Sequence, residues 1–350
     1  MSQTINLQRR RFLQHSALIA CGIGLSGTAI PVIAQSTSSH IRIAFNPGVE
    51  NSTLTTLMSQ QGFFRQYDAD VTFIPASGTS GPFKAITSGA ADLCMTSGYN
   101  GLLSQIARGA KVKIVGAGMK KTALAIYAAQ DRIETLQDLK GKIVAVGSSM
   151  GLLHMLMLEL LKEKDIDASQ INFVNKGSNE ACYKAVIQGE ADACCSSVSH
   201  LNNKDGLAVI QEGNLWQSLP DYIFQTAYAS DAALKNKHNS IVAVMAAYGS
   251  LYNYLMSPDA HDAFFSARKH AEKIFNPESA QADWDFIQMQ KPYSSDLSLT
   301  ENDISYQQQI SLQLGNLKQK QPFSIIADMS AAADAAKLVK TGSLANHAIS

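Results

Sequence analysis

The sequence is poor in cysteine, in aromatic residues and in charge. Five of its 350 residues are cysteine, 7% are aromatic and 17% are charged. The cysteines form no CxxC pair and have no histidine pair beside them, so their spacing is not that of a zinc site. Lysine and arginine are scattered along the chain, whereas binding to nucleic acid requires them in clusters. We therefore expect no metal, no cofactor and no nucleic-acid partner.

Two common enzyme motifs are missing as well. No GxGxxG follows a predicted strand, and no HExxH is present. The eight histidines are dispersed along the chain. We expect a protein that binds its solute without transforming it.

The N-terminal apolar stretch is too polar and too rich in glycine for a stable membrane-spanning helix. It follows three arginines at positions 9–11, which are the only charged residues before residue 35. This arrangement resembles a twin-arginine export signal, so we assign residues 1–34 to a signal peptide that is cleaved near Ala34-Gln35. The mature protein is then periplasmic. Lipid attachment through Cys21 is an alternative.

Four cysteines remain beyond the predicted signal. An even number of cysteines in an exported protein can form disulfides. However, Cys94 and Cys194 lie inside predicted strands, and the neighbouring Cys194 and Cys195 point to opposite faces of one strand. Together with Cys182, they are expected to be buried free thiols that act as small hydrophobic residues.

One phrase of the sequence occurs twice. AITSGAADLCMTS at 85–97 and AVIQGEADACCSS at 185–197 match in register over an offset of one hundred residues. In each copy a predicted helix ends at a glycine, Gly89 or Gly189, where a left-handed backbone is favoured. A strand follows each glycine, so the repeat predicts two units with the same local structure.

The repeat also distinguishes structural from functional positions. Asp92 and Asp192 come at the start of their strands, where we expect each carboxylate to accept backbone N–H groups. Ser97 and Ser197 come at the carboxyl ends of the same strands, where open α/β sheets bind ligands. Two such units can face each other across one cleft.

Strands and helices alternate from residue 41 to residue 118, and the alternation restarts at residue 135. Short connections between alternating elements predict largely parallel sheets that are covered by helices. The last third of the sequence, from about 232 to 341, has helical spacing throughout. The predicted fold class is α/β, with two Rossmann-like lobes.

Several sequence segments occur in the same order as in a known protein family. IRIAF, GFF, the two repeated phrases, ARGAKVKIVGAG and LQDLKGKIVAVGSSMGLLHMLM follow the order found in periplasmic solute-binding proteins of ABC importers, of the nitrate, sulfonate and taurine type. The resemblance implies a type II periplasmic binding protein fold, in which a two-segment hinge joins the lobes. Lobe I would contain residues 40–120 and 226–345, and lobe II residues 121–225. The crossings would lie near Lys120–Ala128 and Phe224–Ser230.

Two glycine-rich turns are the strongest candidates for binding the solute. SGTSG at 77–81 and GSSMG at 147–151 each precede a predicted helix, so free backbone N–H groups and the positive end of a helix dipole can face an anion. The hydroxyls of these turns can add donors. The candidate side chains are Ser77, Thr79, Ser80, Ser148 and Ser149.

Other polar and aromatic residues follow strands of the predicted lobes. Asn46 follows the first strand, and Tyr99 and Asn100 follow Ser97 in one loop. Asn179 begins a helix of lobe II, and Tyr228 lies on the expected return crossing, where its ring could cover the cleft. With Ser97 and Ser197, these residues complete the predicted ligand-binding set.

The predicted function is therefore capture of a small organic anion, a sulfonate or a carboxylate with an apolar or aromatic body. The resemblance implies hinge closure around the solute, followed by delivery to a membrane permease that a cytoplasmic ATPase drives. We expect a monomer. The alternatives are an exported enzyme or a relative of pyrimidine-precursor proteins on the same fold, and a periplasmic protein that senses its ligand.

Overall fold

Two mixed five-stranded sheets organise the part of the chain that the structure describes. The structure is a computed structural model, and it describes residues 39–78, 80–99, 101–129, 131–203 and 205–347, with side chains up to residue 341. Residues from Ser38 onward belong to one compact unit, so both sheets are parts of one body. The predicted signal peptide lies outside the described residues.

The first sheet has the strand order β2-β1-β3-β10-β4. Its strands are β1 (Ile41–Phe45), β2 (Val71–Pro75), β3 (Leu93–Ser97), β4 (Val112–Ala117) and β10 (Thr226–Ser230). β1 pairs in parallel with β2 and β3, while β10 runs antiparallel to both β3 and β4. The sheet is therefore largely parallel, as predicted, and its one antiparallel strand comes from a distant part of the sequence.

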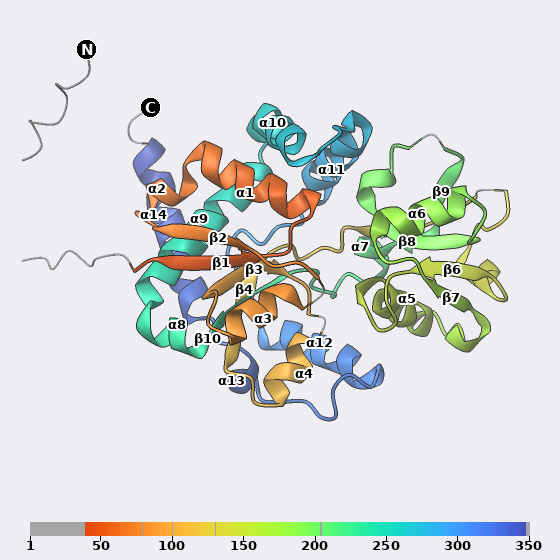
Figure 1. The fold of residues 1–350 in the computed structure, drawn as a ribbon, viewed down its shortest axis with the longest axis horizontal. Helices are drawn as coiled ribbons and strands as arrows, with labels where there is room; N and C mark the ends of the chain where they lie inside the picture. Colours follow the sequence, from red (N-terminus) through yellow and green to blue (C-terminus); the bar gives the residue numbers. More distant parts are fainter. Residues whose placement is uncertain (1–38, 79, 100, 130, 204, 348–350) are drawn as a thin grey trace, which may run out of the picture. The chain divides into compact units, whose positions relative to one another are not determined.

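The second sheet repeats this order as β7-β6-β8-β5-β9. Its strands are β5 (Leu124–Ala129), β6 (Ile143–Val146), β7 (Asn172–Asn175), β8 (Ala193–Ser197) and β9 (Leu207–Asn214). Here β5 is the antiparallel strand, and it pairs with β8 and β9. The two sheets thus share one topology, and Figure 1 shows them as separate groups of strands.

The repeated sequence segment provides the middle strand of both sheets. Its two copies form β3 and β8, the third strand of each sheet. Gly89 and Gly189 have φ angles of 76° and 73°, so both helix ends are left-handed as predicted. Asp92 and Asp192 each accept a backbone N–H of the neighbouring strand, at 2.9 Å from Arg42 N and 2.8 Å from Ile143 N. The structural role expected for both aspartates is confirmed.

Helices cover both faces of each sheet (Figure 1). On the first sheet, α1, α2 and α9 (His238–Leu255) lie on one face and α3, α4 and α13 (Phe323–Ile326) on the other. The helices up to α7 are α1 (Val49–Gln61), α2 (Phe63–Gln66), α3 (Gly81–Thr87), α4 (Leu102–Ala107), α5 (Leu152–Glu163), α6 (Asn179–Ile187) and α7 (Leu215–Ser218). No helix within the described ranges is long and apolar enough to cross a membrane.

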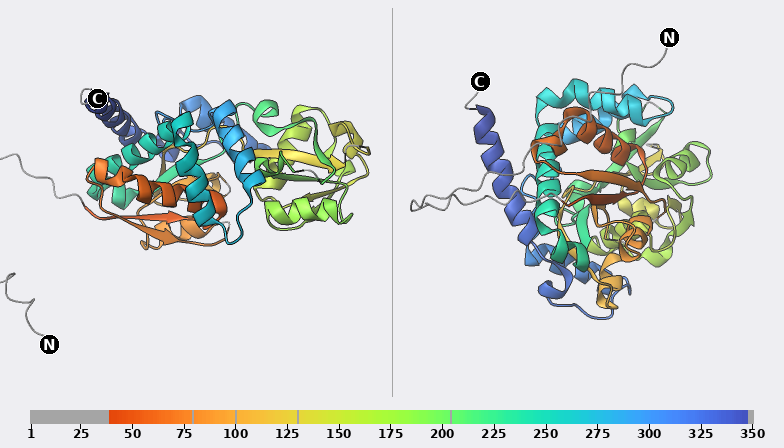
Figure 2. Two further views of the ribbon diagram at one scale, coloured as in Figure 1. Left: turned by 90° about the horizontal axis from the view of Figure 1, so that it is seen from above. Right: turned by 60° about the vertical axis from the view of Figure 1, so that its left-hand side comes forward.

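The C-terminal third is helical, as its spacing predicts. Its helices are α8 (Asp231–Asn236), α9 (His238–Leu255), α10 (His261–Ala271), α11 (Pro277–Gln290), α12 (Glu301–Gln313), α13 (Phe323–Ile326) and α14 (Ser330–His347). The short 3-10 helices of the chain are η1 (Leu136–Leu139), η2 (Ala168–Gln170), η3 (Val198–His200) and η4 (Pro258–Ala260). α10 packs against α1 beside the first sheet, while α11 packs against η3, which directly follows β8 of the second sheet. The tail therefore contacts both halves of the fold (Figure 2).

Three chain segments run side by side between the two sheets. Gly118 N donates to Gln225 O at 3.1 Å, and Gln225 N donates to Met119 O at 2.8 Å. Ser294 N, which belongs to a third segment, donates to Gly118 O at 2.9 Å. The two crossings implied by the resemblance meet here, and the segment that follows α11 lies beside them.

The described cysteines contribute to the cores. Cys94, Cys182, Cys194 and Cys195 are all buried and free, as expected from the sequence. Burial raises the pKa of Cys94 and of Cys182 to about 11, so both thiols stay protonated at neutral pH. They pack as small hydrophobic side chains.

Candidate functional site

A cleft of about 1400 Å³ is lined by residues from both sheets and from the helical tail. Loops at the carboxyl ends of β1 and β3 line one side, and those of β6, β7 and β8 line the other. The carboxyl ends of parallel strands are the usual ligand-binding edge of open α/β sheets. The cleft therefore lies where the fold is expected to bind a ligand.

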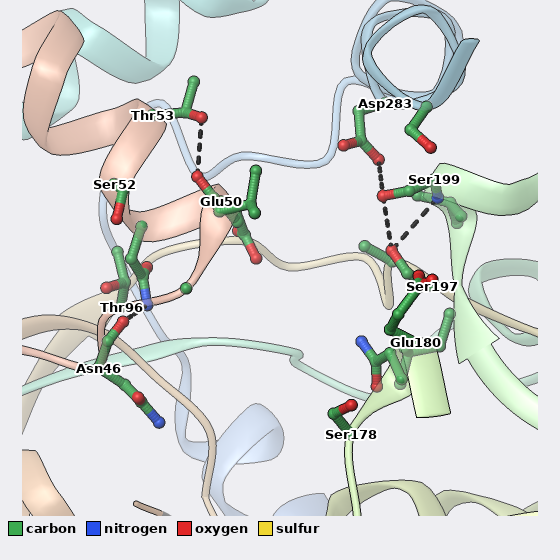
Figure 3. A pocket seen from close by; sticks show the side chains of 18 of the residues that line it. Asn46, Glu50, Ser52, Thr53, Thr96, Ser178, Glu180, Ser197, Ser199 and Asp283 are labelled. Atoms are coloured by element: carbon green, nitrogen blue, oxygen red, sulfur yellow. Dashed lines mark hydrogen bonds between the residues drawn. The ribbon is translucent and has the colours of Figure 1, made fainter. Parts of the chain in front are cut away.

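The N-terminus of α1 forms part of the first-sheet side. Pro47, Gly48, Val49 and Glu50 line the cleft, and no side chain caps the helix at Gly48. The first N–H groups of an uncapped helix lack intrahelical partners and attract negative charge. Figure 3 shows Asn46, Ser52 and Thr96 around this helix end.

The N-terminus of α5 forms the matching part on the second-sheet side. Gly147, Ser148, Gly151 and Leu152 line the cleft, and α5 has no side-chain cap at Gly151. A Cβ atom on Gly151 would lie 2.7 Å from Ser148 Oγ, so the tight turn requires glycine. α1 follows β1 and α5 follows β6, the second strand in each sheet order, and both helices present uncapped ends to the same cleft.

The serines of the repeat reach the cleft from both sheets. Ser97 and Ser197 both line it, at the carboxyl ends of β3 and β8. Ser97 Oγ donates to Gly98 O at 3.3 Å, a long bond within its own loop. Ser197 Oγ lies 2.9 Å from Ser199 Oγ. The two serine-bearing edges therefore face one shared gap.

A polar network connects the second sheet with the helical tail along one side of the cleft. Ser199 Oγ donates to Asp283 Oδ1 on α11 at 2.7 Å, and Asp283 Oδ2 pairs with the guanidinium of Arg268 on α10. Arg268 Nε also donates to Glu272 Oε1 at 2.7 Å. Arg268 is 5% exposed and paired with two carboxylates, so its charge is already compensated.

Glu50 is a half-buried acidic side chain that lines the cleft. It is the second residue of α1, and its carboxylate Oε1 accepts a hydrogen bond from Gln225 Nε2 at 2.8 Å. Burial raises the pKa of Glu50; the hydrogen bond from Gln225 opposes this rise, and the nearby Asp283 adds to it. Figure 3 shows Glu50 on the first-sheet side of the gap and Asp283 and Ser199 on the other.

Five of the predicted ligand-binding residues line the cleft. They are Asn46, Ser97, Ser148, Asn179 and Ser197. Ser77, Ser80 and Ser149 are exposed to solvent and lie outside the lining. Thr79 and Asn100 lie outside the described residues. Among the described residues of the two glycine-rich turns, Ser148 is the one that contributes a hydroxyl to the lining. Gly78 of the other turn and Pro82, which directly follows that turn, also line the cleft.

The structure places both predicted tyrosines in the core and not in the cleft. Tyr99 is 4% exposed and Tyr228 2% exposed, and both belong to the hydrophobic cluster under α3 and α4. Tyr228 lies inside β10, where its ring centroid is 6.4 Å from that of Phe83. The prediction that its ring covers the cleft is wrong, because the expected crossing segment is a strand of the first sheet.

Several lining residues were not predicted from the sequence. They are Glu50, Ser199, His200, Arg268, Glu272 and Asp283. Arg268 and Glu272 have the i, i+4 spacing of an ordinary surface pair, and Glu50 has the first-turn position of an ordinary helix-dipole residue. Only the approach of α10 and α11 to the cleft distinguishes these residues, and this approach has no local sequence signal.

The turn between β6 and α5 also matches the Gly-x-Ser-x-Gly spacing of a nucleophile elbow, with Ser149 at its centre. In that motif the serine occupies the strained position of the turn. Here the residue with a positive φ, 58°, is Met150, and its N–H donates to His154 Nδ1 at 3.1 Å. Ser149 lies outside the cleft lining, so the turn has the spacing of the motif without its geometry.

Comparison with family models assigns the part of the chain that contains most of the strands to one family. Residues 50–260 match the model described as NMT1/THI5 like. The chain belongs to the NMT1/THI5-like family. The match includes both copies of the repeated phrase and the N-terminus of α5, and it begins at the second residue of α1. A search of curated proteins found no match.

Solved structures similar to this NMT1/THI5-like protein have the periplasmic binding protein fold. The aliphatic sulphonate binding protein SsuA from Escherichia coli is 18% identical with a TM-score of 0.67, over 83% of this chain and 92% of that chain. The periplasmic sulfonate-binding protein SsuA from Methylobacillus flagellatus is 16% identical with a TM-score of 0.68, over 86% and 95%. The fold expected from the resemblance to the nitrate, sulfonate and taurine type is confirmed.

An enzyme shares the same architecture. The desulfurization enzyme DSZB is 14% identical to this chain with a TM-score of 0.61, over 85% of this chain and 99% of that chain. At such identities the likeness establishes the fold alone. Function must therefore be argued from the residues of the cleft.

Proposed function

We propose that this protein captures a small organic anion in the cleft between its two sheets, as the periplasmic binding component of an ABC importer. The proposed lobes are residues 40–120 with 226–345, and residues 121–225. The proposal follows the sulfonate-binding proteins named above, and the anion itself is argued from the lining of the cleft.

One observation carries the proposal: two uncapped helix ends, those of α1 and α5, line the same cleft from opposite sheets. Each end offers backbone N–H groups and a positive dipole to a carboxylate or a sulfonate. Ser97, Ser148 and Ser197 add hydroxyl donors. An anion bound there needs no arginine of its own, which fits the compensated charge of Arg268.

The size of the cleft supports closure around the ligand. Pockets that enclose a small molecule have volumes of about 300–1000 Å³, and this cleft exceeds that range. A small anion would touch both helix ends only if the sheets approach each other. We propose that the ligand stabilises the closed form because it bridges contacts from both sides, and that the closed form docks on the permease.

The proposed export route places capture in the periplasm, through the twin-arginine-type signal assigned to residues 1–34. A sensing role would use the same capture step and would differ only in the receptor. The remaining alternative is that the protein is an enzyme, because the enzyme DSZB has the same fold. The thiols offer little support for such chemistry, since the four described cysteines are buried and none lines the cleft.

A thermal-shift screen of the purified protein tests the proposal. The compounds are alkanesulfonates, aliphatic and aromatic carboxylates, nitrate and pyrimidines, in a buffer that itself contains no sulfonate group. Organic anions are expected to raise the midpoint of unfolding, because a ligand that binds only the folded state stabilises it. Stabilisation by neutral or cationic compounds alone would refute the proposed anion site. Hits that are recovered chemically altered would indicate an enzyme.

A further inference from the structure

We propose that anion capture is coupled to the uptake of a proton by Glu50, an inference that rests on the function proposed above. Glu50 is the second residue of α1, so its carboxyl group lies beside the helix end that would hold the anion. An ionised Glu50 and a bound anion would be two like charges in one partly enclosed cleft. Such a pair is strongly unfavourable unless one charge is removed or compensated.

Among the residues that the structure describes, Glu50 forms no ion pair: Lys184 in the cleft lining pairs with Glu180, and Lys273 in the lining is exposed to solvent. The one hydrogen bond of the Glu50 side chain there comes from the neutral amide of Gln225, which is 6% exposed. Arg268 on α10 is a nearby cation that lowers the pKa of Glu50, but less than burial raises it, and Arg268 is paired with Glu272 and Asp283. Loss of the Glu50 charge would accommodate an anion without breaking these ion pairs.

The other groups that face Glu50 do not favour its ionised form. Asp283 on α11 adds a negative charge, and Tyr252 on α9 and Tyr293 of the third connecting segment are buried phenols that stay neutral. Tyr252 and Tyr293 stack on each other with ring centroids 4.8 Å apart. This environment agrees with the raised pKa of Glu50, whose first cause is burial. A proton on Glu50 also turns the carboxyl group into a hydrogen-bond donor for the anion.

Glu180 provides a matched comparison inside the same cleft. It is the second residue of α6, but its side chain is 59% exposed and its carboxylate lies 3.1 Å from Lys184 Nζ. His200 Nε2 lies 3.6 Å from the other carboxylate oxygen. The charge of Glu180 is compensated on the protein, so an anion in the cleft does not require its protonation.

Calorimetric titration with 1-propanesulfonate tests the coupling, because a sulfonate keeps its charge between about pH 5 and about pH 8. The proteins are the wild type, Glu50→Gln and Glu180→Gln, in amine buffers that carry no sulfonate. If only the protonated form binds, the affinity of the wild type falls by up to about tenfold per pH unit above the pKa of Glu50. Glu50→Gln should keep its affinity across this range, and Glu180→Gln should retain the wild-type slope.

A second measurement gives the number of protons that the protein takes up when the ligand binds. The binding enthalpy of the wild type should change with the ionisation enthalpy of the buffer, whereas that of Glu50→Gln should not. Gln225→Leu removes the hydrogen bond that favours the ionised carboxylate, so it should move the loss of affinity to higher pH. This variant keeps Glu50 in place and remains informative if Glu50→Gln unfolds.

Each outcome decides between distinct conclusions. An unchanged slope in Glu50→Gln overturns the coupling and assigns the pH dependence to another group such as His200. Weaker binding by Glu50→Gln at every pH also overturns it, because a neutral side chain at this position should bind the anion as well as the protonated carboxyl group does. If neither propanesulfonate nor any anion from the thermal screen binds to the wild type or the variants, the proposed function itself fails.

Discussion

At the scale of single residues, two aspartates with the same position in the repeat have different surroundings. Asp92 is 5% exposed and accepts hydrogen bonds from Arg42 and from Lys237 Nζ at 3.0 Å. Asp192 accepts one backbone N–H from Ile143, and its side chain is partly exposed. Burial disfavours the charge of Asp92, but these hydrogen bonds outweigh it and lower the pKa of Asp92 to about 2. The aspartate of the repeat thus forms ion pairs in the first sheet, whereas in the second sheet it only accepts a backbone N–H group.

Asp92→Asn should therefore destabilise the protein far more than Asp192→Asn. We expect a loss of about 2–4 kcal/mol for Asp92→Asn at neutral pH, because two cations lose their charged partner. Asp192→Asn should cost less than about 1 kcal/mol, since an amide oxygen can still accept the N–H group. Urea unfolding of both variants at pH 7 measures the difference.

The pH dependence of this effect has a defined sign. A lowered pKa means that the Asp92 contribution is fully present above the unfolded-state pKa and is lost as the pH falls through that of the folded state. The stability difference between wild type and Asp92→Asn should shrink from about pH 5 towards about pH 2. A difference that stays constant over this range would show that the ion pair does not hold the strand.

Prediction of the candidate site from sequence succeeded where local signals exist. Ser97 and Ser197 were identified because the repeat places both at strand ends, and both line the cleft. Tyr99 was misplaced because the direction of a loop side chain depends on the helices packed around it. Arg268 was missed because it reaches the cleft through the packing of α10, which no nearby residue encodes.

At the scale of elements, the beginnings of α1 and α5 are the parts of the site that can be tested most directly. Both helices start after a glycine with an extended backbone, Gly48 at ψ 169° and Gly151 at ψ 174°. Proline is well tolerated at the first position of a helix, and an extended residue before it avoids a clash. A proline there removes one N–H group and leaves the helix intact.

Val49→Pro and Leu152→Pro should each weaken binding of an anion about fivefold to tenfold, which corresponds to one hydrogen bond of about 1 kcal/mol. Their unfolding midpoints without ligand should stay close to that of the wild type. Glu301→Pro is the matched control, because it changes the first residue of α12, outside the cleft lining, after an extended Thr300. Equal affinities for all three variants would exclude both helix ends as anion contacts.

The elements also show where prediction of the fold reached its limit. The parallel strands and their helices were expected at nearly their observed positions, because alternating patterns and glycine stops are local signals. β5 and β10 were expected as crossing segments, yet each is an antiparallel strand, the fourth in its sheet order. An apolar run such as LAIYAA indicates burial but carries no information about strand direction or partner.

At the scale of the whole molecule, closure predicts a ligand-dependent distance between the two sheets. The four described cysteines are buried, so cysteines introduced on exposed helix faces can be labelled selectively. Spin labels at Ser59→Cys on α1 and Lys162→Cys on α5 report on opposite sides of the cleft, and both positions are exposed.

Addition of a ligand from the thermal screen should shift and narrow the distance distribution between these labels. A control pair at Ser59→Cys and Lys84→Cys lies on two helices of the first sheet and should not change. Pulsed electron–electron double resonance measures the distance distribution of both label pairs. The closure mechanism is excluded if a saturating ligand leaves the first distribution as it was.

The placement of β10 has a consequence for how the chain is made. All strands of the second sheet come from one continuous stretch, whereas the first sheet needs β10 between β3 and β4. As the chain leaves the ribosome, the second sheet can be finished while β3 and β4 still await the strand that joins them. The half that is synthesised first is therefore completed last, and its unpaired strand edges stay exposed until most of the polypeptide has emerged.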